Sequence, residues 1–257
     1  FFDTGLPAKS GVGGGLLAVA RGRVGLGAFS PRLDANGNSV RGVAAMKNIS
    51  EGAGLHLLDF RREGAAKFGD AAKAIGLLAS TRSERLAVAV CSVDGEEASA
   101  GAAETPFALQ ATANPFVYAA ACEWAGSEAV HARVGYEPSG NPFHAIVFDP
   151  KSNRPYNPMG NAGAIAVCSL VPGRTVDEKS ERVRRRLAAM AGVESLSIDE
   201  SVLLAERAAS DRNHAIACLL RNFGLVDDED AALDLYLRNC SIKADCRVLA
   251  RMGATLA

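Results

Sequence analysis

The chain carries the sequence LLAVARGRVGLGAF at residues 16–29, two short apolar runs that Arg21-Gly22-Arg23 separates. This spacing predicts a β-hairpin. A further buried strand is predicted over 86–93, where Asp94-Gly95 ends it, and another strand is expected to reach Ala100. These strands would form the single sheet of the fold.

Most of the remaining sequence has the apolar periodicity of helices. We expect helices over 40–60, 65–79, 114–124, 162–170, 176–191, 197–222 and 230–239, and one from Cys246 toward the end. Pro115 fits the first turn of its helix, where an N–H has no intrahelical partner. The stretch 135–163 is rich in Gly, Pro and Asn, which is typical of a long ordered loop. Few strands and many helices predict one sheet covered by helices.

Composition excludes several classes of function. The chain has 257 residues, 48% of them hydrophobic and 22% charged, and a net charge of −1. No broad field therefore draws it to nucleic acid or to an anionic membrane. The basic run Arg182 and Arg184–Arg186 is interleaved with apolar residues, which favours a solvated helix face over a nucleic-acid site. No apolar run approaches the ~20 residues of a membrane span, and no signal peptide is visible.

The six cysteines form no CxxC pair and no Cys/His cluster with zinc spacing. They are Cys91, Cys122, Cys168, Cys218, Cys240 and Cys246. Most lie in apolar segments, so we expect buried thiols in a reducing compartment, cytoplasmic or mitochondrial. No metal ion and no cofactor are expected.

Several longer segments carry a resemblance to a known family. They are GLPAKSGVGGG at 5–15, FSP at 29–31, GNSVRG at 37–42, EPSG at 137–140, NPMGNAGAI at 157–165, Glu206-Arg207 with Asp211-Arg212-Asn213, and Tyr236 with Cys240-Ser241-Ile242. Together they resemble the serine-dependent glutaminases, which have the serine β-lactamase and penicillin-binding-protein fold.

The resemblance covers most of the chain and implies its architecture. The implied class is α/β (α+β), with a central antiparallel sheet flanked by helices and an all-helical subdomain at about 114–257. Residues 1–257 would form one glutaminase-like domain. Residues 1–60 match the C-terminal part of the family and 61–257 its N-terminal and middle parts, so the order is that of a circular permutation. Relatives commonly form oligomers.

The resemblance also implies a pocket for an amino acid. Asn161, Glu206, Asn213 and Tyr236 match substrate-binding positions, and the Val12 backbone N–H matches an oxyanion-hole donor. Lys9 and Ser10 are further candidates for the pocket. Taken alone, Glu206 could equally be a surface charge, Tyr236 a core residue and Asn161 a helix cap.

The catalytic positions of the resemblance are altered. The family has Gln-Ser-x-x-Lys, whereas this chain has Gln110-Ala111-Thr112-Ala113-Asn114. Ala111 replaces the nucleophile and Asn114 the base, and neither a methyl group nor an amide can serve in those roles. Thr112 would be turned ~100° from Ala111 on a helix, and Ser10 is a hydroxyl on the substrate side. A segment that supplies an active-site tyrosine in the family has no match.

Three hypotheses follow. The first is a catalytically inactive glutaminase-like protein with a structural or interaction role, with protein partners or as a homo-oligomer. The second is a module that binds glutamine or glutamate in a retained pocket. The third is an active glutaminase with a non-standard nucleophile. No hypothesis has a nucleic-acid partner.

Overall fold

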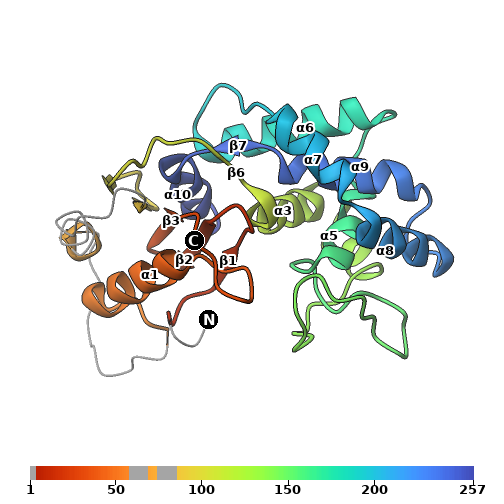
Figure 1. Ribbon diagram of the computed structural model, residues 1–257, viewed down its shortest axis with the longest axis horizontal. Coiled ribbons are helices and arrows are strands. Elements are labelled where there is room, and N and C mark those ends of the chain that lie inside the picture. The colour runs from red at the N-terminus through yellow and green to blue at the C-terminus, as the bar shows by residue number, and fades with distance from the viewer. Residues whose placement is uncertain (1–3, 58–68, 74–85) are drawn as a thin grey trace. The chain divides into compact units, whose positions relative to one another are not determined.

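The computed structural model describes residues 4–57, 69–73 and 86–257, and they form a mixed α/β fold (Figure 1). The chain divides into two compact units. The sheet unit comprises Phe1–Thr112, Ala188–Glu194 and Lys243–Ala257. The helical unit comprises Ala113–Leu187 and Ser195–Ile242.

The sheet unit is built on one antiparallel sheet in the order β1-β2-β3-β4-β5. Its strands are β1 (Ala8–Ser10), β2 (Gly15–Ala20), β3 (Val24–Phe29), β4 (Ala87–Ser92) and β5 (Glu97–Ala100). Ala18 pairs with Leu26, and Leu26 pairs with Val90. The predicted hairpin and the two later strands are thus confirmed.

The two faces of the sheet carry different helices. Side chains alternate between the faces of a strand, and Leu16, Leu26 and Val88 form a core with Met46 and Ile49 of α1 (Val40–Ala53). The helix begins after Ser39, whose side chain accepts from the Gly42 N–H, and ends at Gly54, where φ is 64°. The helix predicted over 40–60 is therefore too long at its C-terminal end, because a left-handed glycine stops it. Residues 58–60 lie outside the described residues.

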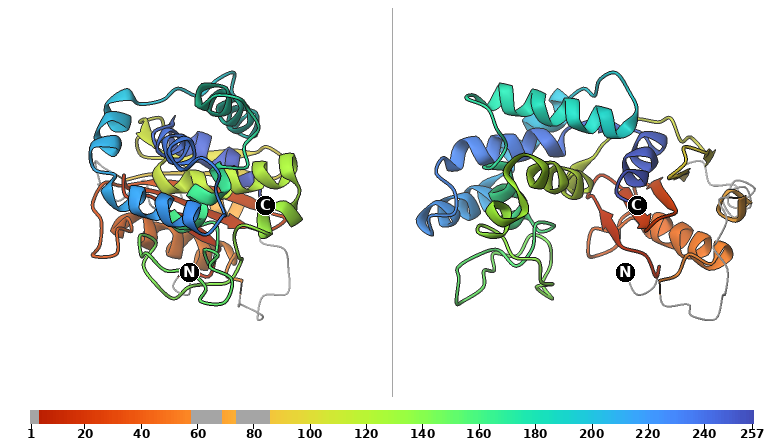
Figure 2. Two further views of the ribbon diagram at one scale, coloured as in Figure 1. Left: turned by 90° about the vertical axis from the view of Figure 1, so that its right-hand side faces the viewer. Right: turned by 180° about the vertical axis from the view of Figure 1, so that it is seen from behind.

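The opposite face of the sheet packs against α10 (Cys246–Ala254), which lies beside the strands in both views of Figure 2. The approach is close because β3 presents glycines. A Cβ atom at Gly25 would lie 2.1 Å from the Ala254 nitrogen, and one at Gly27 would lie 2.4 Å from the Cys246 carbonyl oxygen. Only residues without a side chain allow this packing.

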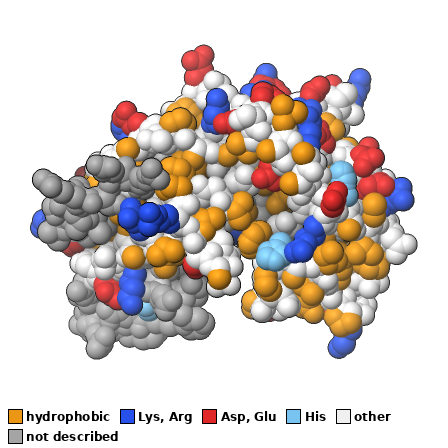
Figure 3. Space-filling view, viewed as in Figure 1, with side chains coloured by type: hydrophobic (Ala, Val, Ile, Leu, Met, Phe, Trp, Pro, Cys, Tyr) orange, Lys and Arg blue, Asp and Glu red, His pale blue; other side chains and the backbone are white. Residues whose placement is uncertain are grey.

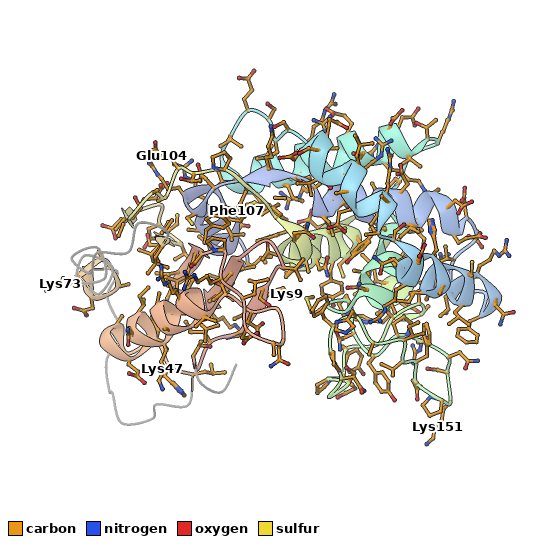
Figure 4. The ribbon with its side chains drawn as sticks, in the orientation of Figure 1. Lys9, Lys47, Lys73, Glu104, Phe107 and Lys151 are labelled. Carbon is orange, nitrogen blue, oxygen red and sulfur yellow. The ribbon has the colours of Figure 1, made fainter. Side chains whose placement is uncertain are left out.

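A second, two-stranded sheet was not foreseen from the sequence. β6 (Phe107–Ala108) pairs antiparallel with β7 (Lys243–Ala244). Phe107, labelled in Figure 4, stacks on Phe29 with ring centroids 4.6 Å apart. Directly after β6, the 3-10 turn η1 (Gln110–Ala113) leads into the helical unit.

The helical unit contains α3 to α9. Their bounds are α3 (Asn114–Ala125), α4 (Ser127–His131), α5 (Asn161–Cys168), α6 (Val176–Ala191), α7 (Glu200–Ala208), α8 (Asp211–Asn222) and α9 (Glu229–Cys240). The last residues of α6 belong to the sheet unit. The helices predicted over 114–124, 162–170, 176–191 and 230–239 agree with α3, α5, α6 and α9 within two residues. The short helix α4 was missed.

The single helix predicted over 197–222 is wrong, because the chain breaks between α7 and α8. Asp199 caps α7 by accepting from the Ser201 and Val202 N–H groups. At the break, the Ser210 hydroxyl donates to the Arg207 carbonyl oxygen. Serine competes in this way with the helical backbone bonds. Of the helix predicted over 65–79, residues 69–73 are described and are helical.

The division into units differs from the predicted subdomain at about 114–257. Residues 188–194 and 243–257 lie with the sheet rather than with the helices. The prediction of one glutaminase-like domain over 1–257, with this helical subdomain, stays a prediction.

The basic side chains on the face that Figure 3 shows are separated from one another and do not form a patch. Several of them lie beside acidic side chains. In the basic run, Arg185 donates to Glu181 at 2.7 Å and Arg186 donates to Glu123 at 2.7 Å. This agrees with a solvated helix face.

Two kinds of feature are absent from the described residues. None of their helices has both the length and the apolar character of a membrane span. No group of three or more His, Cys, Asp or Glu side chains among them could hold a metal ion.

Candidate functional site

A polar cluster joins three helices of the helical unit. Asn161 is the first residue of α5, and its Nδ2 donates to Oδ1 of Asn213 in α8 at 2.9 Å. The Tyr236 hydroxyl, from α9, donates to Oδ1 of Asn161 at 3.2 Å. Gly160 is the N-cap of α5 and no side chain caps the helix, so Asn161 does not act as a cap. Three of the residues predicted to bind substrate therefore contact one another.

Tyr236 is held in its neutral form. It is only 5% exposed, and burial raises the pKa of its phenol well above the usual range. The neighbouring Cys240 and the negative charge of Glu206 raise this pKa further. A neutral phenol keeps its proton and donates a hydrogen bond. Glu206, half-buried on α7, is thus linked electrostatically to the cluster and is not an isolated surface charge.

A strained turn lies in the sheet unit, at the predicted nucleophile position. Gln110 has a φ of 51°, which residues with a side chain seldom adopt, and it is buried. Next to it, Ala111 is 7% exposed. A Cβ atom on Gly11 would lie 2.8 Å from the Leu109 carbonyl oxygen and 3.5 Å from the Ala111 nitrogen. The backbone after β1 therefore packs directly against this turn. Strain of this kind is concentrated at functional sites.

The Thr112 hydroxyl is not available as a nucleophile. Thr112 is 0% exposed, and its Oγ1 donates to the Leu109 carbonyl oxygen at 2.5 Å. Both observations agree with the prediction that it points away from Ala111.

The strand β1 and the turn that follows it hold the other candidates of the sheet unit. The Lys9 ammonium, labelled in Figure 4, donates to the Ser10 carbonyl oxygen at 2.7 Å. The Ser10 hydroxyl donates to Oδ1 of Asn38 at 2.7 Å, and Asp34 in turn accepts from the Asn38 N–H at 2.9 Å. The side chain of Val12 is 43% exposed, on a turn closed by backbone bonds. Ser10 is thus an oriented, half-buried hydroxyl beside a fixed amine.

Asn114 begins α3 and lies in the helical unit. It is 5% exposed, and its Nδ2 donates to the Met159 carbonyl oxygen at 3.1 Å. It also lines a small cavity with Tyr236 and Asn239. Sequence reasoning missed Asn38 and Asn239 as participants. Asn38 lies in the segment 37–42 and Asn239 ends the helix predicted over 230–239, but neither asparagine gave a signal that distinguished it from an ordinary turn or helix residue.

The sheet with helices on both faces, together with the helical unit, defines the β-lactamase-like fold, and glutaminase structures share it. The chain is similar to the Bacillus subtilis probable glutaminase with a TM-score of 0.57 and 30% identity, covering 60% of this chain and 50% of that one. It is similar to Mglu in its native form with a TM-score of 0.63 and 34% identity, covering 71% and 45%. The family model named Glutaminase matches residues 1–58 and 69–257, so the chain belongs to the glutaminase family.

Curated relatives share part of their length with this chain. The glutaminase of Corynebacterium efficiens is 44% identical over 74% of this chain and 45% of its own length. Glutaminase 2 of Bradyrhizobium diazoefficiens is 44% identical over 74% of this chain and 30% of its own length. The glutaminase of Nostoc sp. is 40% identical, with coverages of 74% and 57%. The chain thus spans between about a third and just over half of these relatives.

These relatives overturn one prediction. The first hypothesis from the sequence, an inactive protein with a structural or interaction role, is wrong. Proteins named glutaminase match at 40–44% identity over 74% of the chain. This finding fits the third hypothesis, an active glutaminase, better than the first.

Proposed function

We propose that this chain is a glutaminase-type amidohydrolase, which hydrolyses the side-chain amide of L-glutamine to glutamate and ammonia. The observation that carries the proposal is the cluster of Asn161, Asn213 and Tyr236, with Glu206 electrostatically coupled to it. Its amides and phenol can hold a carboxylate, and the Glu206 carboxylate can face an ammonium group. These are the two charged groups that every α-amino acid presents. Membership of the glutaminase family supports glutamine as the particular substrate.

The nucleophile in this proposal is the Ser10 hydroxyl. Residues 111 and 114 occupy the family's nucleophile and base positions and hold neither a hydroxyl nor an amine, and Thr112 is buried. Ser10 directly precedes Gly11, which packs against the Ala111 turn. Its Oγ would attack the amide carbon, the C–N bond would break, and ammonia would leave with the hydroxyl proton. Water would then hydrolyse the ester, which releases glutamate and restores Ser10.

Two further residues have roles in this scheme. The Lys9 ammonium donates to the Ser10 carbonyl oxygen. After losing one proton to solvent, its neutral amine would take the hydroxyl proton of Ser10 and pass it to the leaving nitrogen. The Val12 backbone N–H, on the exposed turn after Ser10, would stabilise the developing oxyanion.

An ammonia-release assay tests the proposed function. Purified protein is given L-glutamine, with L-asparagine, which is one methylene shorter, as the matched control. We expect turnover of glutamine and much slower release from asparagine. The absence of ammonia release from glutamine at millimolar concentration, with intact folded protein, would refute the proposal.

The order of segments is part of the proposal. We infer a circular permutation relative to the family from the order of the resembling segments in the sequence; the family model matches residues in both parts, 1–58 and 69–257. β3, from the first match, pairs along its full length with β4, from the second. A rearranged chain with residues 69–257 placed before 1–57 should fold with the same sheet and the same activity. Loss of the folded state in that chain would contradict the inference.

The cysteines bear on the compartment of the protein. All six cysteines are free thiols, which supports a reducing compartment such as the cytoplasm. No observation supports the mitochondrial alternative. A homo-oligomer stays a prediction from the family resemblance.

A further inference from the structure

A small cavity lies within the helical unit, between α3, α5 and α9. Its volume is about 10 Å³, and its apolar wall includes Val117 and Val167. This volume accommodates one particle the size of a water molecule. The polar residues on its wall are Asn114, Cys168, Tyr236 and Asn239.

Asn239 contributes an unsatisfied acceptor to this cavity. The residue is 3% exposed, and its Nδ2 donates to the Cys168 sulfur at 3.5 Å. Its Oδ1 is buried and has no hydrogen-bond partner within the described part of the chain. Buried polar atoms are nearly always paired, and an unpaired one costs about 1–3 kcal/mol. The cavity therefore calls for a small hydrogen-bond donor.

The other polar groups on the wall add one acceptor and one donor. The Tyr236 hydroxyl donates its proton to Asn161, so its oxygen can still accept. The Cys168 sulfur already accepts from Asn239 Nδ2, and its S–H is a weak donor. With the two lone pairs of Asn239 Oδ1, the wall offers three acceptor lone pairs and one donor. Ammonia has three N–H donors and one lone pair, whereas water has two donors and two lone pairs. Ammonia therefore matches the polar groups of the cavity wall better than water does.

Charge decides the protonation state of the ligand. None of the lining residues carries a charge, because burial raises the pKa of both the Cys168 thiol and the Tyr236 phenol and keeps them protonated. The charges that act on these two groups, Glu206 on Tyr236 and Lys179 on Cys168, do not lie on the wall. A cation in the cavity would therefore lose its hydration without gaining a counter-charge in contact with it. A neutral molecule is favoured over ammonium, sodium or potassium.

We propose that this cavity is a binding site for one neutral ammonia molecule, held by Asn239 Oδ1. The inference rests on the proposed function only for the origin of the ligand, because ammonia is the product that glutamine hydrolysis would release. A product held beside Tyr236 would slow the next turnover, so the site would act as a product-inhibition site.

The test is the thermal stability of the native protein without glutamine, in phosphate buffer at constant ionic strength. Ammonium chloride replaces sodium chloride stepwise at pH 7 and pH 8. We expect ammonium to raise Tm relative to sodium, because a ligand that binds the folded state stabilises it. The total ammonium needed for half the effect should fall about tenfold between pH 7 and pH 8, as the neutral fraction rises. Methylammonium chloride, whose free base is too large for the cavity, should have no such effect.

Variants locate the effect. Asn239→Leu removes the acceptor, and Ala164→Val fills the cavity from its apolar wall; each should abolish the ammonium-specific shift. Asn222→Leu, an exposed site at the end of α8, is the control and should retain it. If a variant does not fold, the pH and methylammonium experiments on the native protein still decide whether neutral ammonia binds.

Three outcomes would overturn the proposal. Equal Tm in ammonium and sodium means that water alone fills the cavity. A shift that does not depend on pH means that a cation binds. A shift that survives in both Asn239→Leu and Ala164→Val places the ammonia elsewhere. Because no step of the test uses turnover, failure of the proposed function would appear separately, in the ammonia-release assay.

Discussion

The turn at Ala111 and the cluster around Asn161 are held in place by different kinds of contact. At the turn, backbone packing sets the geometry, because Gly11 packs against it and Gln110 has a left-handed φ. In the cluster, side chains set the geometry, because Asn161 bonds to both Asn213 and Tyr236. A geometry made by backbone packing does not depend on the side chain at position 111, whereas a geometry made by side-chain bonds depends on each residue that makes them.

The largest expected effect is on turnover, and it is expected at Ser10, in the unit that contains the Ala111 turn. Ser10→Ala should lower turnover of glutamine by about 10,000-fold or more with little change in KM, because a nucleophile acts only in the chemical step. The measurement is steady-state ammonia release. Ser99→Ala, on the exposed face of β5, is the control and should leave both turnover and KM unchanged. Unchanged turnover in Ser10→Ala would mean that another group attacks the amide.

The second prediction breaks the cluster. Asn161→Ala removes two hydrogen bonds and leaves the buried Tyr236 hydroxyl without its acceptor. We expect a rise in KM for glutamine of about 10- to 100-fold and a loss of about 1–3 kcal/mol in the free energy of unfolding. Kinetics and urea denaturation measure the two effects, with the exposed Asn222→Ala as control. A normal KM would remove Asn161 from the substrate site.

The third prediction tests backbone packing at the turn. Gly11→Ala places a Cβ atom 2.8 Å from the Leu109 carbonyl oxygen, whereas Gly13→Ala places one 3.4 Å from that of Ala108. We expect Gly11→Ala to cost about 1–3 kcal/mol in urea denaturation, and Gly13→Ala clearly less. Equal stability of the two variants would show that the turn can move away without cost, and that its geometry is not fixed by this contact.

The fourth prediction uses the raised pKa of Tyr236. Above the unfolded tyrosine pKa of about 10, the unfolded chain loses this proton while the folded chain keeps it. Stability from this group is therefore full below pH 10 and falls as pH rises further, by up to about 1.4 kcal/mol per pH unit. Unfolding by urea at pH 9, 10 and 11 should show a smaller decline in Tyr236→Phe than in the native protein. Tyr136→Phe, at an exposed site, should decline as the native protein does; a decline in Tyr236→Phe equal to that of the native protein would contradict the prediction.

The smallest effect is expected at the surface of the sheet unit. The Arg251 guanidinium hydrogen-bonds to Glu97 and lowers the pKa of that carboxyl, with a further contribution from Arg247. Glu97→Gln should cost at most about 1 kcal/mol at pH 7, because solvent screens the pair. The difference should disappear as pH falls through the lowered pKa of Glu97, since protonation removes the charge in the native protein too. Glu96→Gln on the neighbouring exposed residue is the control, and a cost above that of a surface pair would mean that Glu97 supports the packing of α10.

Much of the fold could be predicted because its signals are local. The two apolar runs of residues 16–29 and the Arg-Gly-Arg between them predicted the hairpin, and the periodicity of 176–191 predicted both ends of α6. The predicted helix ends were wrong where a single hydrogen bond, at Ser210, or a single left-handed glycine, Gly54, stops a helix. The β6–β7 pair was missed because its strands are two residues long and 134 residues lie between them, so neither segment shows a pattern by itself.

The candidate site divides in the same way. The sequence by itself determined the family, the residues matched to the amino-acid pocket, and the absence of a hydroxyl and an amine at positions 111 and 114, since these are matters of residue identity. Only the tertiary structure decided that Asn161 bonds to both Asn213 and Tyr236. It also decided that Thr112 is fully buried and that Asn239 leaves an unpaired oxygen at a cavity. Those facts depend on how α3, α5, α8 and α9 pack, because burial and hydrogen-bond partners arise from contacts between segments that are distant in the chain.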